Sequence, residues 1–139
     1  MRSSAGFTLI EILVVVIIIG TIASIVGLNI VENLEKSRID TTKIQIANLE
    51  SGLKLFKIRN GFYPDTNEGL DSLVGESQSG RELKQVGGFI DGDKIPLDGW
   101  GNQFEYIGPD QTSNKSYEII SPGPDGLLQT EDDISSLDK

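Results

Sequence analysis

The sequence has no cysteine and no histidine among its 139 residues. Without cysteine the chain forms no disulfide, no cysteine-ligated zinc site and no thiol nucleophile. Without histidine it lacks a Ser-His-Asp triad, histidine metal ligands and the commonest general base in enzymes. The composition therefore argues against most classes of enzyme.

Basic residues are also scarce, with 12 Lys and Arg against 21 Asp and Glu and a formal net charge of -9. Only residues 32–60 carry a net positive charge, whereas residues 91–139 hold most of the acidic excess. Nucleic-acid binding depends on clustered Lys and Arg that neutralise phosphates. The charge balance therefore predicts no nucleic-acid partner.

One long apolar run stands out, because residues 12–31 contain no charged side chain. As a helix, 20 residues at about 1.5 Å each span the thickness of a bilayer core. A cleaved secretory signal has a shorter apolar stretch of about 7–15 residues and a small-residue cleavage site, which Ala23-Ser24 imitates. Because the run continues apolar beyond Ala23, a retained membrane helix fits better, with Arg2 on the cytoplasmic side.

Glu11 lies at the entrance to this run, four residues after Phe7. One interpretation is that its carboxylate lies at headgroup depth or favours the positive end of the helix dipole. The other is that it needs a cation within the membrane, because a lone buried carboxylate is costly there. A cut before Phe7 would create such a cation, a new α-amino group.

The segment Gly6-Phe7-Thr8-Leu9-Ile10-Glu11 and its aliphatic helix resemble the class III signal of type IV pilins and pseudopilins. The resemblance implies that a prepilin peptidase cuts between Gly6 and Phe7 and methylates the new amine of Phe7. It also implies that Glu11 is the assembly glutamate, which attracts the amino terminus of a neighbouring subunit during filament growth. Residues 1–6 are then a leader peptide.

Apolar residues continue beyond the membrane run at helical spacing, which predicts one helix from near Phe7 to about Arg59 that ends at Asn60-Gly61. The residues at this spacing are Ile39, Ile46, Leu49, Leu53 and Phe56, and the last four form one stripe that the rest of the domain must cover. Residues 69–74 permit a short helix, and residues 103–107 and 116–120 alternate as two strands of a hairpin. The predicted fold class is α+β, pilin-like, with a long N-terminal helix packed on a small antiparallel sheet. The expected parts are the leader at 1–6, the membrane and assembly half of the helix at 7–31, and a globular domain at 32–139.

Tyr63-Pro64 and the segment 98–102, Asp-Gly-Trp-Gly-Asn, are similar to segments of the G-type major pseudopilins of type II secretion. In this sequence Gly99 stands where that family usually has proline. Trp100 is expected to anchor the loop in the core.

Acidic residues cluster near the C-terminus, after the turn at 121–126. Ca²⁺ binds about six to eight oxygens of carboxylates, carbonyls and water, but charge runs more often only face solvent, and the spacing excludes an EF-hand. The resemblance favours calcium, because G-type pseudopilins bind it in a loop of this pattern. It implies Asp125, Asp132 and Asp133 as ligands, with a backbone carbonyl near Pro122 and without Glu131.

The resemblance implies a structural protein that polymerises into the periplasmic pseudopilus and supports export of folded proteins across the outer membrane. The expected partners are further copies of the chain in a helical filament, minor pseudopilins, an inner-membrane assembly platform and prepilin peptidase. The expected location is the inner membrane, single-pass, with the globular domain in the periplasm. Two alternatives are a type IV major or minor pilin of a surface fibre and a membrane-anchored, calcium-dependent binding module.

Overall fold

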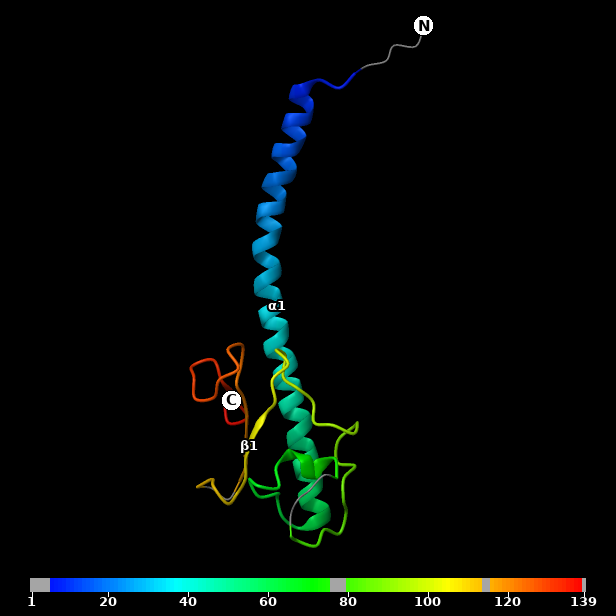
Figure 1. The fold of residues 1–139 in the computed structure, drawn as a ribbon, viewed down its shortest axis with the longest axis vertical. Coiled ribbons are helices and arrows are strands. Elements are labelled where there is room, and N and C mark those ends of the chain that lie inside the picture. Colours follow the sequence, from blue (N-terminus) through cyan, green and yellow to red (C-terminus); the bar gives the residue numbers. More distant parts are fainter. Residues whose placement is uncertain (1–5, 76–79, 114–115, 139) are drawn as a thin grey trace. The chain divides into compact units, whose positions relative to one another are not determined.

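The computed structural model describes residues 6–75, 80–113 and 116–138, with residues 25–30 described by their backbone alone. The order of elements is a long helix α1 (Leu9–Asn60), a 3-10 helix η1 (Leu70–Leu73), and strands β1 (Glu105–Ile107), β2 (Glu118–Ser121) and β3 (Ile134–Ser135) (Figure 1). The chain divides into two compact units, Met1–Lys36 and Ser37–Lys139, and each is described by itself. The predicted division at residue 31 stays a prediction.

The predicted long helix is confirmed, since α1 runs from Leu9 to Asn60. Lys57 and Arg59 lie in its last turn, where positive charge favours the negative end of the helix dipole. Gly61 then takes a left-handed φ of 95°, and its N–H donates to the carbonyl of Lys57 at 2.7 Å. A glycine in this conformation is the usual C-terminal stop of a helix.

The three strands form one antiparallel sheet in the order β1-β2-β3. Tyr106 pairs with Ile119 between β1 and β2, which confirms the predicted hairpin. Strand β3 pairs with β2 through Ser121 and Ile134. This third strand was not predicted from the sequence, because its two residues are too few to show an alternating pattern.

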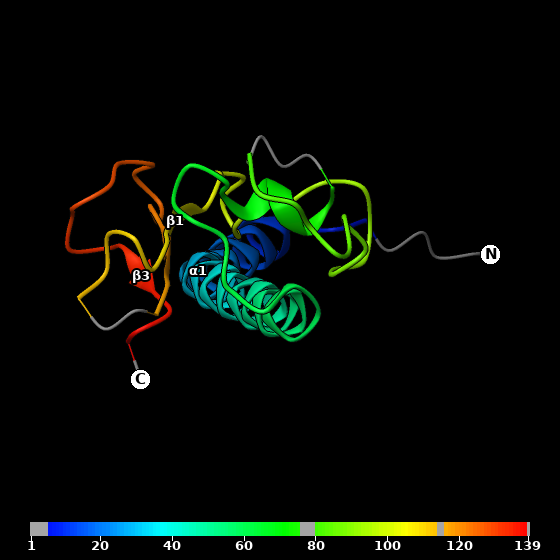
Figure 2. The same cartoon turned by 90° about the horizontal axis from the view of Figure 1, so that it is seen from below.

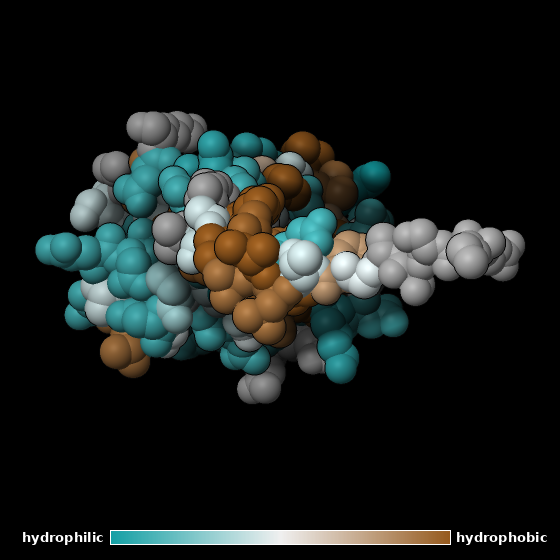
Figure 3. Space-filling model, turned by 90° about the horizontal axis from the view of Figure 1, so that it is seen from above, coloured by the Kyte–Doolittle hydropathy of each residue, from teal (hydrophilic) through white to brown (hydrophobic). Residues whose placement is uncertain are grey.

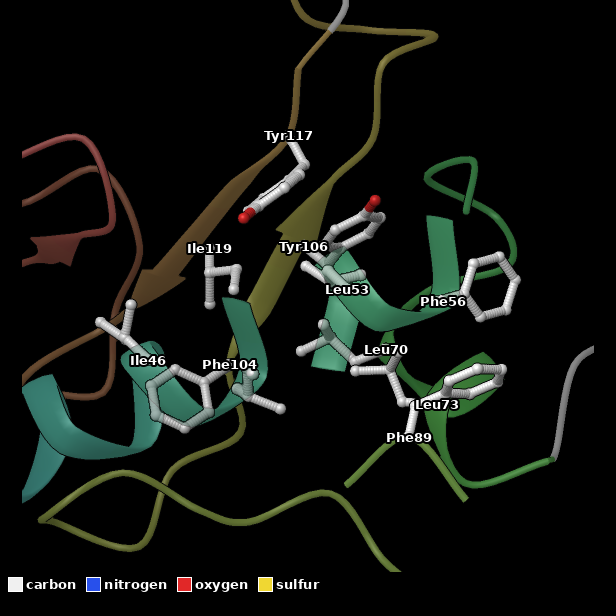
Figure 4. Close-up of a cluster of buried hydrophobic side chains, with 11 residues drawn as sticks. Ile46, Leu53, Phe56, Leu70, Leu73, Phe89, Phe104, Tyr106, Tyr117 and Ile119 are labelled. Carbon is white, nitrogen blue, oxygen red and sulfur yellow. The ribbon is translucent and has the colours of Figure 1, made fainter. Parts of the chain in front are cut away.

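The hydrophobic core lies between one face of α1, the sheet and the segment that contains η1 (Figure 4). Leu49, Leu53 and Phe56 are fully buried, and Ile46 nearly so. They pack with Leu70, Leu73, Phe89, Phe104, Tyr106, Tyr117 and Ile119. The predicted stripe of these four helix residues is confirmed, whereas Ile39, which continues the spacing toward the N-terminus, is 36% exposed and lies outside the core.

Residues 61–97 contain little regular structure in their described part, and polar contacts hold them in place. The Arg81 guanidinium contacts Glu68 at 2.5 Å and Asp65 at 2.9 Å, and it lies 4.1 Å from the centre of the Phe62 ring. The Tyr106 hydroxyl donates to the buried Pro64 carbonyl at 2.8 Å. The Tyr-Pro segment singled out in the sequence is thus tied to the sheet.

A close contact joins α1 to the loop before β1. The Gly99 N–H donates to the Thr42 hydroxyl at 2.9 Å, and this hydroxyl donates to the Arg38 carbonyl. A Cβ built on Gly99 would lie 2.3 Å from the Arg38 carbonyl oxygen, so the loop lies against the helix backbone itself. Only a residue without a side chain fits at position 99.

Candidate functional site

The first candidate site is the start of α1, where Thr8 and Glu11 form a capping box. The Thr8 N–H donates to a Glu11 carboxylate oxygen at 3.1 Å, and the Glu11 N–H donates to the Thr8 hydroxyl at 3.3 Å. The Thr8 hydroxyl also donates to the Glu11 carboxylate at 3.1 Å. Such reciprocal bonds satisfy amide groups that a helix start leaves without partners. Thr8 was missed in the sequence analysis, although a threonine three residues before a glutamate signals this arrangement.

Gly6 and Phe7 precede the helix in irregular backbone and are exposed. This placement makes the predicted cleavage bond accessible, and the predicted mature chain would begin one residue before the capping threonine. The Glu11 carboxylate accepts from the backbone N–H of Thr8, the residue that follows Phe7. The geometry shows its helix-capping contacts, while its assembly role stays a prediction.

Large apolar side chains gather around the N-terminal part of α1 (Figure 3). Residues 12–19 are all apolar and exposed, and eight consecutive residues make about two turns, so they cover every side of the helix. Those from Leu9 to Ile22 are between 48% and 89% exposed. No helix within the described residues is both long and apolar enough to cross a membrane. The predicted run at 12–31 includes residues 25–30, whose side chains lie outside the described part, so the membrane span stays a prediction.

The second candidate site is the acidic loop that links β2 to β3. The Asp125 N–H donates to an Asp132 carboxylate oxygen at 3.3 Å, which brings these two predicted ligands together. The Asp133 carboxylate instead accepts from the Gln129 N–H at 2.7 Å and from the Thr130 hydroxyl at 3.2 Å. Within the described residues, no three acidic side chains form a group that could hold a metal ion.

The base of this loop is nevertheless tightly closed. Gly123 has a left-handed φ of 65°, and a Cβ there would lie 2.4 Å from the Asp132 carbonyl oxygen. Pro122 is buried beside it. A side-chain hydrogen bond from Thr130 and the Asp125 N–H lower the pKa of the Asp132 carboxyl, so this group stays ionised. The donor set of carboxylates and carbonyls fits the chemistry of calcium, although Asp133 points to a different partner in this structure.

Asp98 connects this loop to the rest of the domain, and the sequence analysis did not identify its role. Its buried carboxylate accepts from the Ser121 hydroxyl at 2.7 Å and from the N–H groups of Trp100 and Asn102 at 3.0 and 2.7 Å. The Asn102 amide in turn donates to the Gly123 carbonyl at 2.8 Å. The expectation that Trp100 anchors this segment in the core was wrong, because Trp100 is only half-buried and lies outside the core cluster.

Comparison with known proteins places the chain in a family. Residues 29–137 match the family described as type II secretion system (T2SS), protein G, and residues 1–27 match the prokaryotic N-terminal methylation motif. Proteins named type II secretion system core protein G are similar to the chain. The Escherichia coli K12 protein is 40% identical over 134 residues, which cover 94% of this chain and 89% of the relative. The Aeromonas hydrophila protein is 37% identical over 137 residues, which cover 97% and 93%.

A solved structure agrees with the sequence relatives. It is the crystal structure of the major pseudopilin from the type 2 secretion system of enterohaemorrhagic Escherichia coli. The two chains superpose with a TM-score of 0.66 at 32% sequence identity, and the match covers 78% of this chain and 93% of the other. The fold is therefore pilin-like, as predicted. The chain belongs to the protein G family of the type II secretion system.

Proposed function

We propose that this chain is a structural subunit that polymerises into the periplasmic pseudopilus and so supports export of folded proteins. The observation that carries the proposal is the exposed apolar surface around the N-terminal part of α1. A helix that is apolar on all sides requires lipid or other helices around it. A pseudopilus subunit meets this requirement twice: lipid surrounds the helix in the membrane, and the helices of other subunits surround it in the filament.

The same proposal assigns the early steps of the pathway. Prepilin peptidase cuts the exposed bond between Gly6 and Phe7 and methylates Phe7, while the apolar part of α1 holds the chain in the inner membrane. The globular domain then lies in the periplasm. Assembly involves the inner-membrane platform and minor pseudopilins, and the role is structural rather than catalytic.

Replacing Glu11 with alanine tests this function. We expect Glu11→Ala to be cleaved normally but to form no filaments and to export no protein, because no carboxylate then attracts the amino terminus of the next subunit. Cleavage is measured by mass spectrometry of Phe7, filaments by electron microscopy of periplasmic extracts, and export by assay of the culture medium. Filaments on the cell surface instead of in the periplasm would favour the alternative of a type IV pilin.

The matched control is Glu11→Gln, since glutamine at this position preserves the capping box with Thr8 but carries no charge. We expect Glu11→Gln to fail in assembly as Glu11→Ala does. Normal filaments from the glutamine variant would show that Glu11 acts only as a helix cap, and would contradict its pairing with an amine.

We also propose that calcium binds the acidic loop through Asp125, Asp132 and Asp133, with a carbonyl near Pro122. The oxygen donors, the ionised Asp132 and the tightly closed base of the loop support this assignment. When bound, the ion would neutralise carboxylates that otherwise repel one another. In a domain without disulfides, the ion would act as a cross-link between the two ends of the loop.

Calcium is therefore expected to raise the unfolding temperature of the purified chain in detergent. At about 1,000 times Kd, binding adds about 4 kcal/mol, and each kcal/mol moves the midpoint by about 4–8 °C in a domain of this size. Asp125→Ala should abolish this increase and cost at most about 1 kcal/mol in chelator, where it loses only one exposed hydrogen bond. Glu131→Ala is the control and should retain the increase. Equal effects of Asp125→Ala with and without calcium would contradict the site.

A further inference from the structure

One face of α1 in the globular unit is directed away from the core and carries apolar side chains. Residues 44, 48, 51, 55 and 58 follow the three- and four-residue spacing of a single helix face. We call this face the α1 stripe; its residues are Ile44, Asn48, Ser51, Leu55 and Ile58. Ile44 is 60% exposed and Ile58 is 77% exposed. Seen along the helix, the sheet lies to one side of α1 and the 61–97 segment to another (Figure 2).

A groove of about 650 Å³ runs beside the α1 stripe. Ser51 and Leu55 form part of one wall, and Phe89 and Pro96 form part of the other. The Ser51 hydroxyl donates to the Ala47 carbonyl within the helix. The groove has both apolar and polar lining, the apolar part from Leu49, Leu55, Phe89 and Pro96 and the polar part from Asn48, Asp91 and Lys94. Its apolar part suits an inserted aliphatic side chain.

A second exposed apolar feature lies on the loop between β2 and β3. Leu127 is 63% exposed and Leu128 is 45% exposed. The next residue, Gln129, holds a left-handed φ of 68°, which is uncommon for a residue other than glycine. A hydrogen bond from the Leu127 N–H to the Asp125 carboxylate at 2.8 Å fixes the turn. The two leucines are thus presented to solvent by an ordered loop.

The two features carry opposite charge. Lys43, Lys54 and Arg59 border the α1 stripe, and residues 37–60 hold five Lys and Arg against two Asp and Glu. Glu50 lies 4.0 Å from Lys54, and Asp91 and Lys94 both line the groove, so the basic side chains remain in excess around the stripe. Glu131 accompanies the leucines, and residues 122–133 hold four acidic residues and no basic one. Complementary charge around apolar centres is the pattern of a protein interface, because it orients the partners and excludes wrong ones.

The two features cannot meet within one chain. Figures 1 and 2 place the loop on the outer side of the sheet, away from α1. A surface that fits a different surface of an identical chain forms a head-to-tail contact, and repetition of such a contact produces an open helical filament.

We propose that the loop formed by Leu127, Leu128 and Glu131 docks on the α1 stripe of a second copy of this chain. The leucines enter the groove beside Leu55, and Glu131 lies near Lys54. This inference rests on the proposed function, since it names the contact between globular domains within the filament. It also gives Glu131 and the aspartates different roles: Glu131 contacts a second copy of the chain, whereas the aspartates bind calcium.

The absence of cysteine from the sequence permits a direct test with introduced pairs. The full chain with Leu55→Cys and Leu128→Cys is expressed in secreting cells, oxidised and run on a gel without reductant. We expect a ladder of dimers, trimers and larger species, because each subunit links to a neighbour on both sides. The matched control pairs Leu128→Cys with Val86→Cys, whose native side chain is 64% exposed, and should give no ladder.

A charge exchange provides a second measurement that does not depend on the cysteine variants. Glu131→Lys should lower the number of filaments at least tenfold, and the added change Lys54→Glu should restore them. Filaments without a ladder, or unchanged filaments from Glu131→Lys, would overturn the docking contact. Failure of the unmodified chain to form filaments would instead refute the proposed function.

Discussion

Asp98→Ala is expected to lower the free energy of unfolding of the globular domain by about 3–5 kcal/mol. The buried carboxylate accepts from the Ser121 hydroxyl and from two backbone N–H groups, and Ser121 is itself fully buried. A buried donor that loses its acceptor costs about 1–3 kcal/mol, and bonds to a charged group lie at the upper end. The corresponding decrease in the thermal midpoint exceeds about 10 °C.

Two further variants distinguish the contribution of the Asp98 hydrogen bonds to stability from the effect of removing any carboxylate. Asp98→Asn retains one oxygen acceptor but turns an NH₂ group toward other donors, so we expect a loss between that of Asp98→Ala and wild type. Asp91→Ala removes an exposed carboxylate from the preceding segment and should change stability by less than about 0.5 kcal/mol. A thermal midpoint for Asp98→Ala within experimental error of wild type would show that the network does not stabilise the fold.

Gly99→Ala is expected to destabilise the domain by about 2–4 kcal/mol. The added Cβ would lie 2.3 Å from the Arg38 carbonyl oxygen and 2.8 Å from the Arg38 Cα, and helix backbone cannot move aside as a flexible side chain can. The loop must therefore lift from α1, which adds the loss of its hydrogen bond to Thr42 to an overpacking cost of about 1–3 kcal/mol. Chemical denaturation measures the change.

Thr42→Val is the matched control, because valine has a similar shape but no hydroxyl. It should cost about 1 kcal/mol, the value of the hydrogen bond without the steric clash. If Gly99→Ala lowers the free energy of unfolding no more than Thr42→Val does, the close contact with the Arg38 backbone does not restrict the residue at position 99. Gly99→Pro removes the same N–H and adds the same Cβ, so it should cost at least as much as Gly99→Ala in this chain.

The long helix and the β1–β2 hairpin could be predicted from the sequence because both depend on local patterns. The spacing of Ile46, Leu49, Leu53 and Phe56 fixes the buried face of α1, and Asn60-Gly61 fixes its end. Strand β3 could not be predicted, because its two residues gain their structure only from pairing with β2. A tertiary contact of this kind leaves no period in the sequence.

The network around Asp98 was missed for a related reason. Its partners at positions 100, 102 and 121 come together only in the fold, because Ser121 lies 23 residues from Asp98 in the sequence. One signal was present. It concerns the neighbouring contact at Gly99: Thr42 lies four residues before Ile46 on the buried face of α1, and a polar residue there indicates a buried hydrogen bond.

For the acidic loop, the family resemblance predicts which residues are present but not how each side chain is oriented. It identifies the residue types, and the structure brings Asp125 and Asp132 together. It does not determine the rotamer of Asp133, which depends on the local amide and hydroxyl donors of Gln129 and Thr130. Carboxylates that would repel one another without a cation take such local donors instead.

The short edge strands of the sheet affect how strongly the chain tends to aggregate at high concentration. Strand β1 has three residues and β3 has two, and these are the strands at the two edges. Long exposed edges pair with other chains and start amyloid-like aggregation, whereas very short edges offer too few N–H and C=O groups in a row. Subunits at high local concentration are thereby protected from irreversible pairing of their strands. They can then associate into a filament through side-chain contacts, which are reversible.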